Sequence, residues 1–247
     1  MGLLSLLLAA CGSAPTPAAA PDPVRGSLTV FAAASLTEAF NRIGAEFTGL
    51  HPGASVQFNF AGSPTLVTQI TEGAQADVFA SADQPNMDRV TGAGLSTGPP
   101  VVFARNRLEI VVEKGNPRHI TSLADLARPG LLVVLAGLTV PAGKYAGQAL
   151  QSAGVRVTPV SEETDVKSVV TKVALGEADA GIVYVTDVRA AGSTVEGITI
   201  PDQHNVIASY PAVALKGAAS PVAAKAFIDF LLGPGRSILT SFGFAAP

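Results

Sequence analysis

Short apolar runs alternate with helical patterns from Ser27 onward, and this alternation constrains the fold more than any other feature of the chain. Residues 28–33 and 181–185 are almost entirely apolar, as buried strands are. In residues 36–47, apolar side chains recur every three or four positions, which predicts one buried helix face. Repeated strand–helix alternation indicates parallel sheets covered by helices, the α/β class. Such sheets bind ligands at the carboxyl ends of their strands.

The same patterns place the expected elements along the chain. Strands are expected at residues 28–33, 56–60, 77–80, 101–103, 108–112, 131–135, 181–185 and 210–215. Helices are expected at residues 36–47, 66–70, from 84 onward, and at 142–153, 166–173 and 223–231. The 247 residues are enough for two compact lobes of roughly 100 residues each.

Charge excludes some classes of partner. The formal net charge is −3, so the chain has no basic field for nucleic acid or for an anionic membrane surface. A net negative charge also gives no long-range attraction to an anion. Any anion site in this chain must therefore be built locally.

The first residues are typical of a lipoprotein signal peptide. Residues 3–10 form an apolar run that is too short for a bilayer span of about 20 residues but suits a signal-peptide core. Leu8-Ala9-Ala10-Cys11-Gly12 resembles the bacterial lipobox, although no Lys or Arg precedes the run. We expect residues 1–11 to be a signal peptide that ends at a lipidated Cys11, and residues 12–26 to be a Pro/Ala-rich tether. The folded body would then be extracytoplasmic and attached to the membrane through the lipid anchor only.

Four turns between strands and helices carry the residues of chemical interest. Ser35 stands three residues before Glu38, as in a capping box, and Ser63 is expected to cap the next helix. Two further helices open at residues 140–145 and 164–166. One such turn is typical of any capped helix, whereas four in two halves of one α/β chain favour a shared ligand site.

Helix N-termini can bind an anion without a cationic side chain. Each carries about half a positive charge, so four converging helices would offer roughly +2. Backbone dipoles and N–H donors could therefore balance a dianion.

Several short motifs follow one another through the body of the chain. They are Phe31-Ala32-Ala33-Ala34-Ser35-Leu36-Thr37, Ser63-Pro64-Thr65-Leu66, Ala76-Asp77-Val78-Phe79-Ala80-Ser81-Ala82-Asp83, Val140-Pro141-Ala142-Gly143-Lys144-Tyr145-Ala146, Asp165-Val166, Gly181-Ile182-Val183-Tyr184 and Tyr210-Pro211-Ala212-Val213. From Leu28 to the C-terminus, these motifs resemble the family of periplasmic molybdate-binding proteins.

The resemblance implies an α/β, two-lobed periplasmic binding-protein fold of type II. Each lobe would be a mixed, mainly parallel sheet flanked by helices, with the ligand in the cleft between the lobes. One lobe would comprise residues 27–105 and 206–247, and the other residues 106–205. The chain would cross between them near Arg105 and Asn205.

The resemblance also implies the ligands of a tetrahedral oxyanion. Ser35 and Ser63 would donate hydrogen bonds through hydroxyl and backbone N–H groups from one lobe. Ala142 and Val166 would donate through backbone N–H groups, and Tyr184 through its phenol, from the other. The metal would enter only as the oxyanion, so neither a cofactor nor a separate set of metal ligands is expected.

Other polar residues are expected to be structural. Asp83 and Asp165 are expected to cap helices, since a carboxylate would repel a dianion. The three histidines stand far apart in turn-like segments and are expected at the surface; they are His51, His119 and His204. The three tyrosines suggest iron(III) as an alternative ligand, but no anionic or imidazole ligands converge with them; they are Tyr145, Tyr184 and Tyr210.

The function predicted from these observations is capture of molybdate, with tungstate as its close mimic, for an ABC importer. The expected partners are a membrane permease and its cytoplasmic ATPase, and the protein is expected to be a monomer that binds no nucleic acid. An enzyme is disfavoured because the sequence contains no nucleophile elbow, P-loop or metal-ligand spacing. A receptor for sulfate or another tetrahedral oxyanion is the alternative, since sulfate also requires donors only. Phosphate carries a proton and favours a site with an acceptor carboxylate.

Overall fold

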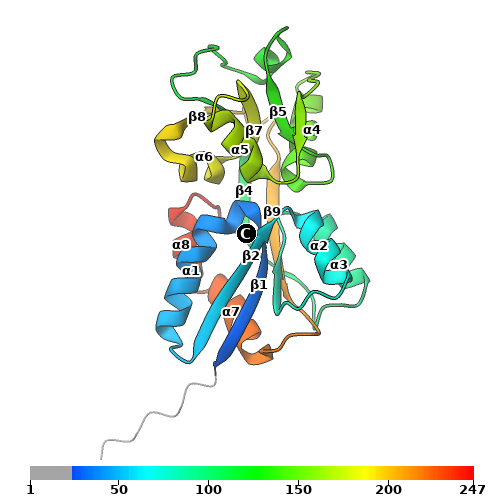
Figure 1. The fold of residues 1–247 in the computed structure, drawn as a ribbon, viewed down its shortest axis with the longest axis vertical. Coiled ribbons are helices and arrows are strands. Elements are labelled where there is room, and N and C mark those ends of the chain that lie inside the picture. Colours follow the sequence, from blue (N-terminus) through cyan, green and yellow to red (C-terminus); the bar gives the residue numbers. More distant parts are fainter. Residues whose placement is uncertain (1–23) are drawn as a thin grey trace, which may run out of the picture.

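The computed structural model describes residues 24–247, which form two halves stacked along the longest axis of the molecule (Figure 1). The expected signal peptide, Cys11 and most of the expected tether lie outside the described residues. Within the described part of the chain, no helix is both long and apolar enough to cross a membrane.

One half contains both ends of the described chain, and we call it the terminal half. In its sheet, β1 (Gly26–Ala33) pairs in parallel with β2 (Ala54–Ala61) and with β3 (Val78–Ala80). Next to β3 lies β9 (Ile207–Ala214), which is antiparallel, and β9 pairs with the first part of β4 (Val101–Glu113). The strand order is therefore β2-β1-β3-β9-β4, a mixed sheet built from both ends of the sequence.

Helices cover both faces of this sheet (Figure 1). They are η1 (Ala34–Leu36), α1 (Thr37–Leu50), α2 (Ser63–Thr71), α3 (Gln84–Gly92), α7 (Pro221–Leu232) and α8 (Gly235–Ser241). Helix α1 packs against β2, α7 and α8, whereas α2 packs against α3 and β1. Phenylalanine rings fill the core under α1: the ring centroids of Phe47 and Phe227 lie 5.4 Å apart, and those of Phe40 and Phe103 lie 5.7 Å apart.

The other half, which we call the middle half, is built from the central part of the sequence. The remainder of β4 pairs with two antiparallel strands, β7 (Ala180–Tyr184) and β8 (Val195–Thr199). In turn, β5 (Val133–Ala136) pairs in parallel with both β7 and β6 (Ser161–Glu163). Its helices are η2 (Leu123–Ala127), α4 (Pro141–Ser152), α5 (Val166–Ala174), α6 (Val185–Ala191) and η3 (Gly192–Thr194). Valines of α5 face the sheet, as their spacing predicts.

Strand β4 runs without interruption from one half into the other. Its residues 101–107 pair with β9, and residues 108–113 pair with β7 and β8. The chain returns to the terminal half between β8 and β9. The predicted α/β class with mixed sheets is therefore confirmed, and the strand pairing changes partners between Arg107 and Leu108.

The structure differs from the sequence prediction at β4. Two strands are expected from the apolar runs at residues 101–103 and 108–112, but the structure contains a single strand of 13 residues. Its middle alternates in the manner of a strand, because Arg105 and Arg107 are exposed while Asn106 between them is buried. Because residues 105–107 are all polar, a search for apolar runs does not detect this alternation of exposed and buried positions.

Candidate oxyanion-binding site

All five predicted ligand residues line a single cavity between the two halves. The lining residues are Ala33, Ala34, Ser35, Gly62, Ser63 and Ala82 from the terminal half, and Val140, Pro141, Ala142, Asp165, Val166 and Tyr184 from the middle half. The predicted ligands are buried, and Ser35 and Val166, the most exposed of them, keep only 4% of their surface. The two halves are therefore closed around the cavity.

The fold brings these residues together because each lies at the carboxyl end of a strand. Ser35 follows β1, Ser63 follows β2, Ala142 follows β5 and Val166 follows β6, while Tyr184 is the last residue of β7. The first four stand at or near the start of a helix. Their N–H groups belong to helix N-termini, where the backbone attracts negative charge.

The two serines do not act as helix caps, contrary to the sequence prediction. Ser35 lies inside η1, and no side chain caps η1 or α1. Its Oγ lies instead 3.0 Å from the hydroxyl of Tyr210. Ser63 is the first residue of α2, whose cap is Gly62, and its Oγ accepts a hydrogen bond of 3.1 Å from the N–H of Ala82. In both serines, a partner distant in sequence replaces the local cap.

Two carboxylates near the cavity cap helices, as the sequence predicts. Asp165 accepts from the N–H of Ser168 at 3.0 Å and from its hydroxyl at 3.1 Å. Asp83 accepts from the N–H of Asn86 at 3.1 Å. Asp165 also lines the cavity. Its carboxylate is therefore present at the candidate site, where Ser168 of the same helix donates to both of its oxygens.

Tyr184 presents a hydroxyl whose hydrogen-bonding capacity is unused. The residue is 1% exposed, and its OH has no hydrogen-bond partner among the described residues. Burial raises the phenol pKa well above its ordinary value, so the group is neutral and keeps its hydrogen. Leaving such a group unpaired costs about 1–3 kcal/mol, and a bound acceptor would remove this cost.

The halves touch at the edge of the cavity. A Cβ atom on Gly62 would lie 2.2 Å from the carbonyl oxygen of Thr164, which belongs to the other half. Because atoms cannot approach that closely, only glycine fits at this position when the halves are closed.

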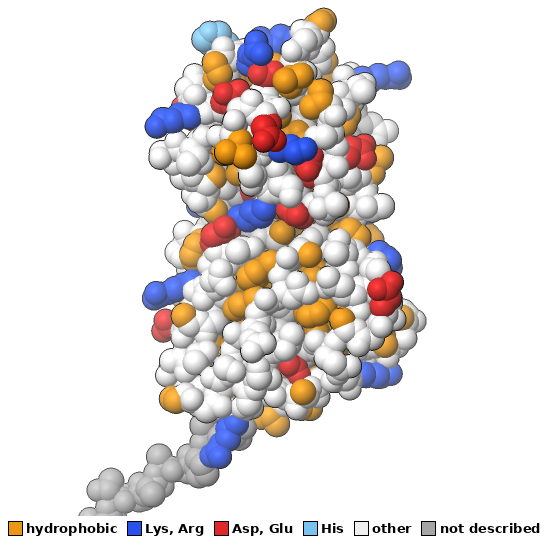
Figure 2. Space-filling view, viewed as in Figure 1, with side chains coloured by type: hydrophobic (Ala, Val, Ile, Leu, Met, Phe, Trp, Pro, Cys, Tyr) orange, Lys and Arg blue, Asp and Glu red, His pale blue; other side chains and the backbone are white. Residues whose placement is uncertain are grey.

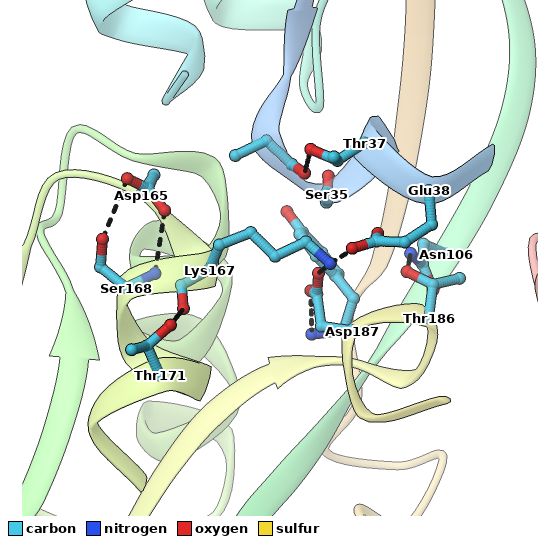
Figure 3. Close-up of polar contacts among 12 residues, drawn as sticks. Ser35, Thr37, Glu38, Asn106, Asp165, Lys167, Ser168, Thr171, Thr186 and Asp187 are labelled. Carbon is cyan, nitrogen blue, oxygen red and sulfur yellow. Dashed lines mark hydrogen bonds and ion pairs between the residues drawn. The ribbon is translucent and has the colours of Figure 1, made fainter. Parts of the chain in front are cut away.

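A lysine joins the halves beside the cavity. Lys167, next to Val166 in α5, lies 2.7 Å from Oε2 of Glu38 in α1 and 3.2 Å from Oδ1 of Asp187 in α6 (Figure 3). In the space-filling view, acidic and basic side chains meet along the waist between the halves (Figure 2). Burial raises the pKa of Asp187 to about 6 despite the neighbouring lysine. Burial alone would lower the pKa of Lys167, but Asp187 and Glu38 outweigh this effect and raise it.

Sequence reasoning did not find these ion pairs, nor a buried polar contact between Asn106 and Thr186. Lys167 and Glu38 are 129 positions apart, and Asn106 and Thr186 are 80 apart. No local spacing signals such pairs. The side chain of Glu38, expected to complete a capping box, bonds to Lys167 instead.

Apart from the Asp165 carboxylate, which accepts from Ser168 of its own helix, the polar groups around the cavity are hydroxyl and backbone groups. Among the described residues that line it, none is Lys, Arg or His. Within residues 24–247, no group of three or more His, Cys, Asp or Glu side chains could hold a metal ion. Hydroxyl groups and helix N-termini around a closed space suit a small, fully deprotonated anion.

Comparisons with known proteins show the family of the chain. The family model of bacterial extracellular solute-binding proteins matches residues 28–245. The molybdate-binding protein ModA of Mycobacterium tuberculosis (strain H37Rv) is 45% identical over 254 residues, which cover 100% of this chain and 97% of that protein.

Two solved structures share the fold. The periplasmic molybdate-binding protein of Azotobacter vinelandii matches with a TM-score of 0.77 at 22% identity, covering 89% of this chain and 99% of that one. The sulfate-binding protein SubI of M. tuberculosis H37Rv matches with a TM-score of 0.78 at 19% identity, covering 89% of this chain and 86% of that one. At such identities the likeness concerns the fold alone, and this fold is found with more than one ligand.

Proposed function

The chain belongs to the bacterial extracellular solute-binding proteins and, within them, to the molybdate-binding family of ABC transporters, and we propose on this premise that it captures molybdate and tungstate for import. The convergence of five predicted donors on one closed cavity supports the proposal most directly. The relatives are binding components of transporters rather than enzymes, and such components work outside the cytoplasm.

The proposed ligand shell consists of hydroxyl and backbone donors. Ser35 and Ser63 donate through O–H and N–H groups, Ala142 and Val166 through N–H groups, and Tyr184 through its phenol. The unpaired hydroxyl of Tyr184 supports this assignment, because a ligand oxygen would satisfy it. Helix N-termini supply the positive potential that the missing cationic side chains would otherwise provide.

Sulfate is the second candidate, because it also requires donors only and a sulfate-binding protein shares this fold. Sulfate has the charge and shape of molybdate but shorter bonds, so its oxygens lie closer to the centre. Donors placed for molybdate would be stretched past about 3.2 Å from sulfate oxygens, where hydrogen bonds weaken. Several weakened bonds, at about 1 kcal/mol each, would give a preference of roughly a thousandfold for molybdate.

The proposed partners are an ABC permease with its cytoplasmic ATPase. A lipid on Cys11 would hold the folded body outside the cell membrane. We propose a monomer without a cofactor, whose only metal is the centre of the bound oxyanion.

Titration calorimetry of the purified protein, at fixed ionic strength, tests the proposal. Molybdate and tungstate are expected to bind tightly and almost equally, since they share charge, shape and nearly the same bond length. Sulfate and phosphate are expected to displace molybdate only in large excess. Displacement by sulfate at a comparable concentration would make the protein a sulfate receptor, and absence of molybdate binding would refute the proposal.

A further inference from the structure

A row of four buried polar groups links the crossing strand to the cavity, and only its last member, Ser35, lines the cavity. In α6 of the middle half, Thr186 Oγ1 accepts a 2.8 Å hydrogen bond from Nδ2 of Asn106, which lies in β4. The same Nδ2 lies 3.5 Å from the hydroxyl of Tyr210 in β9, and that hydroxyl lies 3.0 Å from Oγ of Ser35. All four residues are buried, and Figure 3 shows the Asn106–Thr186 contact below Ser35.

The side-chain amide of Asn106 gives the hydrogen bonds at one end of this row a defined direction. Oδ1 of Asn106 accepts a 2.9 Å hydrogen bond from the N–H of Arg107, which only an oxygen can do, so the amide nitrogen faces the other way. An amide nitrogen donates and does not accept. The oxygen of Tyr210 therefore accepts from Asn106, which leaves the hydrogen of the phenol free to be donated to Oγ of Ser35.

The chemistry of the two hydroxyls favours the same direction. A phenol is the stronger hydrogen-bond donor, because it is more acidic than the hydroxyl of Ser35. Burial raises the pKa of Tyr210 far above its ordinary value, so the phenol keeps the hydrogen that it donates. With the phenol as the donor, Ser35 accepts from Tyr210, and its own hydrogen is left for the cavity.

Ser63 shows the same arrangement with a backbone donor. Its Oγ accepts from the N–H of Ala82 at 3.1 Å, and an N–H group can only donate. The hydroxyl hydrogen of Ser63 is therefore also left for the cavity. In both Ser35 and Ser63, the hydroxyl oxygen thus accepts a hydrogen bond from another group of the protein.

We propose that Tyr210, held by Asn106, is a positioning residue that fixes Ser35 as a donor and so makes the site reject tetrahedral anions that carry a proton. The inference rests on the proposed function of the cavity. If the anion oxygen nearest Ser35 carried a proton, two O–H donors would face each other and their hydrogen atoms would repel. Without the phenol, Ser35 could turn its hydrogen aside, and its oxygen could accept a hydrogen bond from the protonated oxygen of the anion.

Selenate and arsenate provide the matched pair of probes. Both are tetrahedral and close in size. At an alkaline pH at which arsenate carries a single proton, both are also dianions, so they differ mainly in that proton. Their affinities can be measured in one preparation by displacement of molybdate, and the ratio is independent of the fraction of folded protein.

The parent is expected to bind selenate more tightly than hydrogen arsenate, and Tyr210→Phe is expected to reduce this preference about tenfold, which corresponds to about 1.4 kcal/mol. The matched control is Tyr145→Phe, which removes a phenol outside this row of groups and should leave the ratio unchanged. In a Ser35→Ala background, Tyr210→Phe should have no further effect on the ratio, because its action passes through Ser35.

An unchanged ratio in Tyr210→Phe, or an equal effect of that substitution with and without Ser35, would overturn the inference. A parent protein that does not bind molybdate would instead refute the proposed function. The two failures are therefore distinguishable in the same set of titrations.

Discussion

Nζ of Lys167 lies 2.7 Å from Oε2 of Glu38, and this ion pair connects the two halves of the molecule beside the cavity. Lys167 also lies 3.2 Å from Asp187 in its own half. Asp187 would remain beside the lysine if the halves separated, whereas Glu38 would move away with α1. The contact with Glu38 is therefore specific to the closed arrangement.

Glu38→Gln is expected to weaken molybdate binding two- to fivefold, because a partly exposed ion pair contributes up to about 1 kcal/mol. Glu46→Gln is the matched control, since Glu46 pairs with Arg42 of the same helix, at 3.6 Å. Calorimetry at low and high salt gives the measurement. The difference between Glu38→Gln and the parent should shrink as salt rises, and a Glu46→Gln effect of equal size would contradict this role.

Asp187→Asn is expected to change how stability depends on pH. Burial raises the pKa of Asp187 to about 6, above its ordinary value of 3.8, so between these values the folded protein binds more protons than the unfolded chain. This carboxyl therefore lowers the free energy of unfolding as pH rises from about 4 to about 6. Urea unfolding of parent and variant across this range should show the parent losing stability relative to Asp187→Asn. A constant difference would show that the group does not titrate there.

Gly62→Ala is expected to prevent full closure without disturbing either half. The backbone of Gly62, with φ −58° and ψ 138°, suits alanine, but the added Cβ would meet the Thr164 carbonyl of the other half. Overpacking of this kind costs about 1–3 kcal/mol, so molybdate affinity should fall roughly 5- to 150-fold. Thermal unfolding without ligand should be almost unchanged. Gly98→Ala, where a Cβ would meet nothing within 4 Å, is the control.

Ser35→Ala and Ser63→Ala are each expected to weaken molybdate binding by about 1.5–3 kcal/mol, because each removes one hydrogen bond to a charged ligand. Ser35→Asp should be far more damaging, since it places a carboxylate against a dianion. Titration calorimetry measures all three affinities. Molybdate binding by Ser35→Asp at the affinity of the parent would place the site elsewhere.

Tyr184→Phe is expected to separate binding from stability. Its hydroxyl has no partner among the described residues, so its removal should leave the melting temperature without ligand unchanged or higher. At 100 times the dissociation constant, molybdate should stabilise the parent by about 2.7 kcal/mol, or roughly 5–11 °C. At the same molybdate concentration, the rise in Tyr184→Phe should be smaller. A lower melting temperature without ligand would mean that the hydroxyl already has a structural partner.

Much of the fold follows from local sequence patterns. The apolar spacing of residues 36–47 and of residues 166–173 predicts α1 and α5, and both helices are present. Several short elements have no predicted counterpart. Helices α6 and α8 have only seven residues each, too few to show a periodic apolar face, and strand β6 contains no apolar residue. Strand β8 and the short helices η2 and η3 are not predicted either.

The four strand-to-helix turns at the candidate site could be predicted from the sequence, because strand ends meet at one edge of a sheet. The choice of ligand residues, including Tyr184, comes from the resemblance to the family. That these residues bind an anion stays a prediction. What surrounds the lining could not be predicted. Ser35 and Tyr210 are 175 positions apart, and only the folded chain decides that this phenol, rather than Glu38 three residues away, lies beside the serine. Tertiary contacts of Ser35 and Glu38 replace the capping contacts that the local sequence predicts.

Two of the five proposed ligands, Ala142 and Val166, would act through backbone nitrogen atoms. Mutation of a codon can alter a side chain but cannot remove a main-chain N–H, except by introducing proline. At these two positions natural selection would act on size alone, because the side chains are 1% and 4% exposed and leave little room to grow. Part of the proposed recognition would thus be inherited with the course of the backbone rather than with residue identity, and it would survive extensive divergence of the surrounding sequence.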